Sequence, residues 1–164
     1  MASQHVAECV QLLVKNKLTF AFVESATAGR LASEFAMTQD TNDCLLGGIV
    51  CYHPCIKQSL LKVPQALIEQ FTPESAEVTE AITKSLKNYF DADVLVGVTG
   101  LAWEGGSETV QKPVGSMFFH FIIQGQSYRH QQVFTGTAEE IISQAITRVA
   151  QLIMQYLKQR EAQH

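Results

Sequence analysis

The sequence predicts an α/β protein, built as a three-layer α/β/α sandwich around a mixed, mostly parallel sheet. Short apolar runs typical of buried strands alternate with segments of helical periodicity over the first two thirds of the chain. Two strand-like runs follow, separated by a short glycine turn that indicates a hairpin. A long amphipathic segment closes the chain, so helices are expected to cover both faces of the sheet.

Length and composition narrow the class of protein further. The 164 residues suit one domain, and we expect residues 1–164 to form it. The formal net charge is -4 and no run of Lys or Arg occurs, which argues against a nucleic-acid partner. No apolar run approaches the roughly 18–20 residues that cross a bilayer, and the N-terminus lacks the layout of a signal peptide. We therefore expect a cytoplasmic protein without a membrane partner.

The first half of the chain is expected to hold two strands and several helices. Apolar residues between Val6 and Val14 recur at helical spacing, and Ser3 is placed to cap that helix. The next expected elements are a strand at 18–23, a helix at 27–37, a strand at 46–52, a helical turn at 56–61 and a helix opened by Pro64. A further helix is expected to begin at Thr72-Pro73-Glu74 and to bury Val78, Ile82, Leu86 and Tyr89.

The second half adds a strand, a polar loop, a hairpin and a long helix. The strand at 94–98 is expected to break at Thr99-Gly100, before a polar loop at 103–112. Strands at 114–123 and 128–134 form the hairpin around Gly125. Thr137 and Glu140 have the spacing of a capping box. The helix that follows is expected to bury Ile142, Ala145, Ile146, Val149, Ile153 and Tyr156.

The four cysteines do not indicate a metal site or a disulfide framework. Cys51 and Cys55 flank His53, but this is not a usual zinc spacing and no second Cys/His pair follows. Free thiols in apolar segments behave as small hydrophobic side chains. We expect no metal and no cofactor.

Candidate site residues stand where the predicted strands end, which is where open α/β sheets bind ligands. Ser25 would lie at a strand-to-helix junction, beside backbone amides of Thr27, Ala28 and Gly29 that are expected to be unpaired. Such amides can bind a phosphate or a developing oxyanion. The alternative is that Ser25 or Thr27 only caps the helix, since both residue types are favoured there.

Two further strand ends carry suitable chemistry. A lysine such as Lys57 can act as the base for a serine when burial lowers its pKa, and the Tyr52 hydroxyl could relay the proton or orient the lysine. The alternative is a surface lysine with a half-buried tyrosine. Thr99-Gly100 suits either a ligand-facing turn or an ordinary loop. The scattered histidines His53, His120 and His130 are expected to be structural or solvated.

Taken together, these stretches resemble the C-terminal domain family of CinA, the nicotinamide-nucleotide amidohydrolases. The resemblance rests on "ESATAG", "GIVCYHPCIK" and the "LKV" that follows, and on "VGVTGLAWEGGSETVQKPVG". It extends from about Val6 to the last helix.

The resemblance implies a serine amidohydrolase that converts nicotinamide mononucleotide to nicotinate mononucleotide and ammonia. By motif position, Ser25 would be the nucleophile, Lys57 its base, and Tyr52 an assisting group. The substrate-binding positions would be Thr27, Ala28, Gly29, Arg30, Thr99, Gly100, Gly105 and Gly106. The only expected partner besides this small-molecule nucleotide is a further copy of the chain, since apolar content and the resemblance favour a homo-oligomer.

The sequence departs from the family pattern at three places. Ala28 stands where a glycine is usual, and "AWEGG" replaces an Ala-Gly-Pro loop, which adds Trp103 and Glu104. Ala138 occupies the position of an arginine, for which Arg30, Lys112 or Arg129 could substitute. Two other functions therefore stay open: a nucleotide-binding homologue with impaired catalysis, and a serine amidase with another amide substrate.

Overall fold

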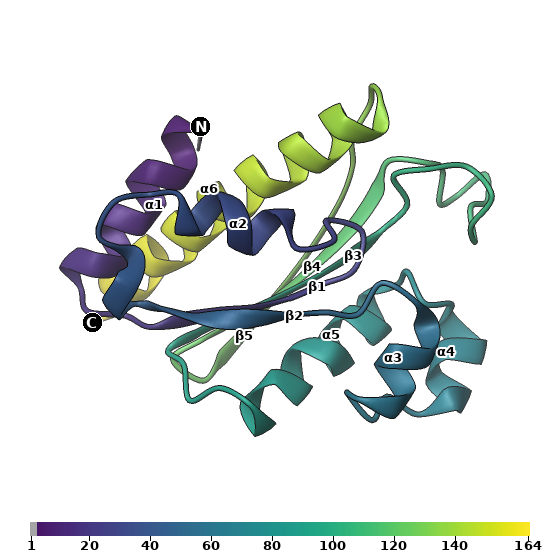
Figure 1. The fold of residues 1–164 in the computed structure, drawn as a ribbon, viewed down its shortest axis with the longest axis horizontal. Helices are drawn as coiled ribbons and strands as arrows, with labels where there is room; N and C mark the ends of the chain where they lie inside the picture. Colours follow the sequence, from purple (N-terminus) through teal and green to yellow (C-terminus); the bar gives the residue numbers. More distant parts are fainter. Residues whose placement is uncertain (1–2) are drawn as a thin grey trace.

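The computed structural model describes residues 3–164 and contains a five-stranded sheet in the order β2-β1-β3-β4-β5 (Figure 1). The central strand β1 (Phe20–Glu24) pairs in parallel with β2 (Leu45–Val50) and with β3 (Val94–Gly100). The hairpin of β4 (Ser116–Ile123) and β5 (Gln126–Val133) continues the sheet in antiparallel pairing. The predicted mixed sheet is confirmed.

Helices cover both faces of this sheet, which confirms the three layers (Figure 1). One face carries α1 (Gln4–Lys15), α2 (Arg30–Ala36) and α6 (Ala138–Ala162). The other side carries α3 (Pro54–Ser59), α4 (Gln65–Phe71) and α5 (Ala76–Ser85). Two short 3-10 turns, η1 (Thr41–Asp43) and η2 (Leu86–Asn88), complete the elements. Each face has its own apolar core.

Local sequence signals account for the element boundaries that were predicted correctly. The Ser3 hydroxyl accepts a hydrogen bond from the Val6 amide and caps α1. The capping box at the start of α6 forms, with reciprocal bonds between Thr137 and Glu140. All five residues of β1 are buried, as its apolar run predicts, because helices pack on both of its faces.

The predicted start of α5 is wrong. The helix begins at Ala76, and Ser75 caps it by accepting a hydrogen bond from the Val78 amide. Thr72 instead ends α4 with a φ of 70°, a conformation that cannot open a helix. Tyr89 is exposed rather than inward, and its hydroxyl donates to the Leu60 carbonyl.

Two boundaries around the candidate site also differ from expectation. The structure begins α2 at Arg30 rather than at residue 27, because residues 26–29 form a turn. It extends β3 through Thr99 and Gly100, which pair with β4. Within residues 3–164, no helix combines the length and the apolar character that crossing a bilayer requires.

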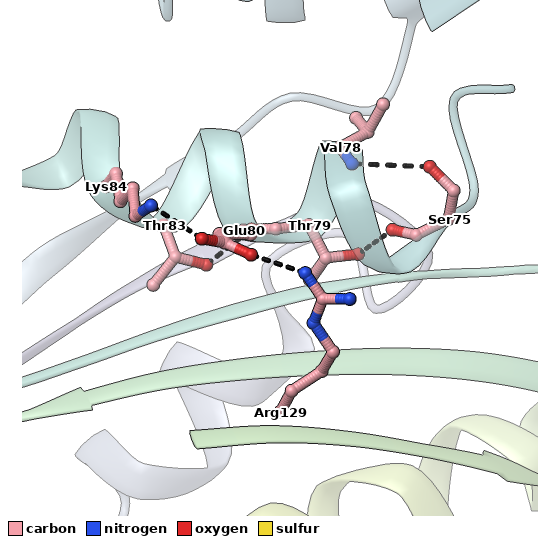
Figure 2. A network of polar contacts seen from close by, with 7 residues as sticks. All are labelled: Ser75, Val78, Thr79, Glu80, Thr83, Lys84 and Arg129. Atoms are coloured by element: carbon pink, nitrogen blue, oxygen red, sulfur yellow. Dashed lines mark hydrogen bonds and ion pairs between the residues drawn. The ribbon is translucent and has the colours of Figure 1, made fainter. Parts of the chain in front are cut away.

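Polar contacts fix α5 against the sheet (Figure 2). The Glu80 carboxylate accepts hydrogen bonds from Lys84 on the same helix and from Arg129 on β5, and these two partners lower the Glu80 pKa to about 2. Thr79 donates to the Ser75 carbonyl. Arg129 is therefore engaged in the contact between β5 and α5.

The order of the connections creates a crevice at the carboxyl ends of the central strands. From β1 the chain crosses to β2 through α2 on one face, and then passes β1 to reach β3 through α3, α4 and α5 on the other face. The connections thus diverge at the carboxyl ends of β1 and β3. Ligands of open α/β sheets bind at such switch points.

Candidate active site

A cavity of about 230 Å³ lies at the carboxyl ends of β1 and β3. Its wall combines the two residues after β1, Tyr52 just beyond β2, the loop before α5 and the end of β3 with the loop that follows it. The lining residues are Ser25, Ala26, Tyr52, Glu74, Gly100, Leu101, Ala102, Trp103, Glu104, Gly105 and Gly106. The structure therefore brings Ser25, Tyr52 and the glycine loop together, as the motifs predicted.

A buried carboxylate holds the turn that presents Ser25. Glu24 is the last residue of β1, and its carboxylate accepts four hydrogen bonds from the turn and from the start of α2. Oε2 accepts from the Thr27 hydroxyl at 2.6 Å, the Gly29 amide at 3.1 Å and the Leu31 amide at 2.9 Å, and Oε1 accepts from the Ala32 amide at 2.8 Å. Glu24 thus does the work of a helix cap from the preceding strand.

Sequence reasoning missed this role of Glu24. The signal was present, because a carboxylate at a strand end followed by a short turn of small residues can reach the first amides of the next helix. The Thr27 hydroxyl is committed to this carboxylate and is buried, so it supports the turn and does not face the cavity.

The turn itself uses left-handed backbone conformations. Ala28 has a φ of 48° and Gly29 a φ of 93°. Glycine adopts such angles freely, whereas an alanine is strained there. The substitution of Ala28 for the usual glycine therefore leaves the turn in place at a cost in backbone energy.

Lys57 meets Ser25 inside the protein. Its Nζ lies 3.1 Å from Ser25 Oγ and donates to the Cys51 carbonyl at 2.9 Å. The helix α3 positions it, and that helix starts at Pro54 with His53 Nδ1 accepting from the Cys55 amide. Lys57 is only 1% exposed. Lys57 is therefore not a surface lysine, and the motifs that contain Ser25 and Lys57 meet in the folded protein.

Burial lowers the pKa of Lys57 below the ordinary lysine value of 10.5, because the uncharged amine is favoured away from water. Negative charge on Cys51 and on Glu74 would act in the opposite direction. A lysine with a lowered pKa, in contact with a serine hydroxyl, is the arrangement by which an amine can take a proton from a nucleophile.

Tyr52 lines the cavity and makes no hydrogen bond to Lys57. It is 60% exposed. Among the hydrogen bonds of residues 3–164, none involves its hydroxyl. Its position suits contact with a ligand that enters the cavity.

The backbone amides of the turn are arranged differently from expectation. The Ala28 amide donates to the Ser25 carbonyl, and the Gly29 amide donates to Glu24. These two amides are therefore not free, contrary to the prediction, whereas the Thr27 amide, the third that was predicted, donates no hydrogen bond within residues 3–164. In the part of the chain that the structure describes, the Ala26 amide has no acceptor, and Ala26 lines the cavity next to Ser25. The amide that follows a nucleophile is a common oxyanion donor.

The last two residues of β3, Thr99 and Gly100, have different roles. Thr99 is fully buried, and its hydroxyl lies 2.8 Å from that of Thr79 on α5, so its side chain supports the fold. Gly100 lines the cavity, and a Cβ there would lie 2.8 Å from the backbone oxygen of Ser116 and 2.1 Å from Met117 Sδ, so the position favours glycine. Gly105 and Gly106 lie in the wall of the cavity.

The basic residues considered as substitutes for the missing arginine are engaged elsewhere. Arg30 contacts Glu34 on its own helix and Ser143 on α6. Lys112 donates three hydrogen bonds, to Thr72 Oγ1 at 2.5 Å, to the Glu74 carbonyl at 3.0 Å and to Ser107 Oγ at 2.8 Å. Ala138, at the position of the arginine, is buried and does not line the cavity.

Lys112 thereby ties the loop after β3 to the segment before α5. Ser107 in turn donates to the Glu74 carboxylate. In residues 3–164, no group of three or more His, Cys, Asp or Glu side chains is placed to hold a metal ion.

Comparisons with known proteins agree with the motifs. A family model described as the CinA C-terminal domain matches residues 2–157. A CinA-like protein of Desulfotalea psychrophila is 33% identical over 149 residues, which cover 91% of this chain and 36% of that protein. Protein YdeJ of Escherichia coli is 29% identical over 148 residues, which cover 90% of this chain and 85% of YdeJ. The chain thus spans roughly a third of the longer CinA-like relatives.

Solved structures share the fold. The competence damage-inducible protein A (ComA) from Klebsiella pneumoniae superposes with a TM-score of 0.89 at 22% identity, over 94% of this chain and 96% of that one. A CinA superfamily protein from Escherichia coli has a TM-score of 0.83 at 27% identity, over 92% of this chain and 88% of that one. The matched family model and the shared fold lead to one conclusion: the chain belongs to the CinA C-terminal domain family.

Proposed function

We propose that the protein is an amidohydrolase in which Ser25 attacks a carboxamide and Lys57 transfers the protons. The observation that carries the proposal is the contact of 3.1 Å between Lys57 Nζ and Ser25 Oγ, with the lysine buried and its pKa lowered.

The geometry supports a two-step reaction. The uncharged amine of Lys57 accepts the proton of Ser25 as Oγ bonds to the carbonyl carbon, and the Ala26 amide donates to the resulting oxyanion. The ammonium of Lys57 then returns a proton to the nitrogen of the amide, the C–N bond breaks, and ammonia leaves an acyl-serine ester. Water attacks the ester while Lys57 accepts its proton, and the carboxylic acid departs as Ser25 is protonated again.

Within this class, we propose a nicotinamide carboxamide as the substrate, and deamidation of nicotinamide mononucleotide to nicotinate mononucleotide is the reaction that the family resemblance implies. The support is the family resemblance together with the serine–lysine pair at the position that the motif assigns. A nucleotide-binding homologue without turnover is a weaker candidate, because the pair is intact. A serine amidase with a different amide substrate is favoured by one observation, the acidic wall formed by Glu74 and Glu104.

Ammonia release from nicotinamide mononucleotide and related carboxamides tests the proposal. We expect turnover by the wild type and a fall of several orders of magnitude in kcat for Ser25→Ala, as is common for loss of a nucleophile. Lys57→Arg should be inactive as well, since arginine stays charged.

Thermal unfolding of the Ser25→Ala variant is the control, and its midpoint should stay near that of the wild type. Near-normal turnover by Ser25→Ala, or by Lys57→Arg, would remove that residue from the mechanism.

A further inference from the structure

The cavity wall carries negative charge and lacks basic side chains. Glu74 and Glu104 both line the cavity. Of the lysines and arginines within residues 3–164, none does. A phosphate monoester carries up to two negative charges and is ordinarily bound by arginine, lysine or free helix amides. The wall offers the opposite charge to the one that such a group needs.

The basic groups nearest to the cavity are already bonded. All three N–H donors of the Lys112 ammonium are used, on Thr72, on the Glu74 carbonyl and on Ser107. Lys57 is directed at Ser25 and at the Cys51 carbonyl, at the place of the reaction. To meet a phosphate in this cavity, Lys112 would have to break its bonds to the loop that forms the wall.

The amides at the start of α2 are not available for a phosphate either. Glu24 accepts from the amides of Gly29, Leu31 and Ala32, which places a carboxylate where a bound anion would otherwise lie. The Glu24 carboxylate therefore already accepts the hydrogen bonds that these amides could donate to a phosphate.

An aromatic ring completes the wall. Trp103 lines the cavity, and its side chain is 68% exposed, so its ring has room to contact a ligand. Indole faces attract flat cationic rings, and neighbouring carboxylates strengthen such a site. Trp103 and Glu104 are adjacent in the loop after β3, where both can reach one ligand.

We infer that this site selects a carboxamide on a positively charged ring that carries no phosphate, in preference to the corresponding phosphorylated nucleotide. This inference rests on the proposed function and names its substrate class. Nicotinamide riboside has the required chemistry, since its pyridinium ring is cationic and bears the carboxamide. Nicotinamide mononucleotide differs from it by the phosphate alone, which makes the two compounds a matched pair.

The test compares kcat/KM for the riboside and the mononucleotide, measured by ammonia release at low ionic strength. We expect the riboside to be preferred about tenfold or more, because the Glu104 carboxylate has no hydrogen bond or ion pair within residues 3–164 and would repel the phosphate on that scale in a partly solvated site. The Glu74 charge contributes less, because Lys112 lies close enough to offset part of it. The preference should shrink as salt is added. A wild-type preference for the mononucleotide would overturn the inference and leave the amidohydrolase intact.

A charge reversal in the wall provides the second arm. Glu104→Lys should lower the preference for the riboside by about tenfold or more. Glu161→Lys makes the same change in net charge in the last turn of α6, away from the cavity, and should leave the preference unchanged. Equal ratios for Glu104→Lys and the wild type would contradict the inference.

Binding separates this inference from the proposed function. Calorimetry with the Ser25→Ala variant measures the affinities for both compounds without turnover. Absence of ammonia release by the wild type would refute the proposed function, while the ratio of the two affinities still decides the charge preference. Tighter binding of the riboside supports the inference, and tighter or equal binding of the mononucleotide overturns it.

Discussion

Replacement of Glu24 by glutamine should destabilise the protein far more than its small change in shape suggests. Oε2 of Glu24 accepts three hydrogen bonds and Oε1 accepts one, from the Ala32 amide at 2.8 Å. Glutamine has a single acceptor oxygen and an NH₂ group. If the oxygen keeps the three bonds, the NH₂ group faces the Ala32 N–H, donor against donor. The opposite orientation loses three bonds to save one.

The magnitude follows from those contacts. A buried hydrogen bond to a charged group contributes about 1.5–3 kcal/mol, and Glu24→Gln loses at least one while the rest become neutral bonds. The expected loss in free energy of unfolding is therefore about 3–5 kcal/mol. For a protein of this length, each kcal/mol lowers the midpoint of thermal unfolding by about 2–4 °C, so we expect a decrease of about 6–20 °C.

Thermal unfolding followed by circular dichroism measures this effect. Glu34→Gln is the matched control, because Glu34 lies on α2, the helix that Glu24 caps, and within residues 3–164 its carboxylate accepts hydrogen bonds only from the partly exposed Arg30. Its loss should cost no more than about 1 kcal/mol. A Glu24→Gln variant whose midpoint lies within about 2 °C of the wild type would refute the role assigned to this carboxylate.

Three other predictions follow from the geometry. The rate of the proposed reaction should rise with pH as Lys57 loses its proton, and the midpoint of that rise should lie below 10.5. Glu74→Gln should move the midpoint to lower pH, because the Glu74 charge raises the Lys57 pKa. An unchanged midpoint would exclude this coupling. Ala28→Gly should raise the free energy of unfolding by up to about 1 kcal/mol by relieving the left-handed φ. The control Ala81→Gly, in the middle of α5, should lower the free energy of unfolding by about 0.5–1 kcal/mol, and urea unfolding measures both. Lys112→Met should free the loop after β3, raise KM more than it lowers kcat, and speed proteolysis between residues 101 and 112; unchanged proteolysis would show that Lys112 does not hold the loop.

The elements that could be predicted from the sequence are those with local causes. The apolar run of β1, the glycine turn between β4 and β5, and the capping box of α6 each specify their structure over a few neighbouring residues. The start of α5 failed because Thr72-Pro73 has the local form of a cap, while Ser75 makes the actual cap and Thr72 takes a positive φ at the end of α4. Local pattern cannot separate two candidate caps three residues apart.

The site could be predicted in its parts but not in its contacts. The motifs identified Ser25 and Lys57, which stand 32 positions apart in the sequence. Their contact depends on how α3 packs behind the end of β1, and no local pattern encodes that packing. The contacts of Arg30 with Ser143 and of Arg129 with Glu80 could not be predicted either, since each partner lies on another element. Glu24 was overlooked because an acid at a strand end is usually solvated, and only the fold of the following turn shows that it is enclosed.

The place of Trp103 gives the protein a built-in optical reporter. The sequence contains one tryptophan, so all indole emission comes from the wall of the cavity. Because that ring is largely exposed to water, any ligand that covers it changes both the wavelength and the intensity of the fluorescence emission. Occupancy of the site can therefore be titrated on the unlabelled wild-type chain, with no dye, no tag and no turnover required.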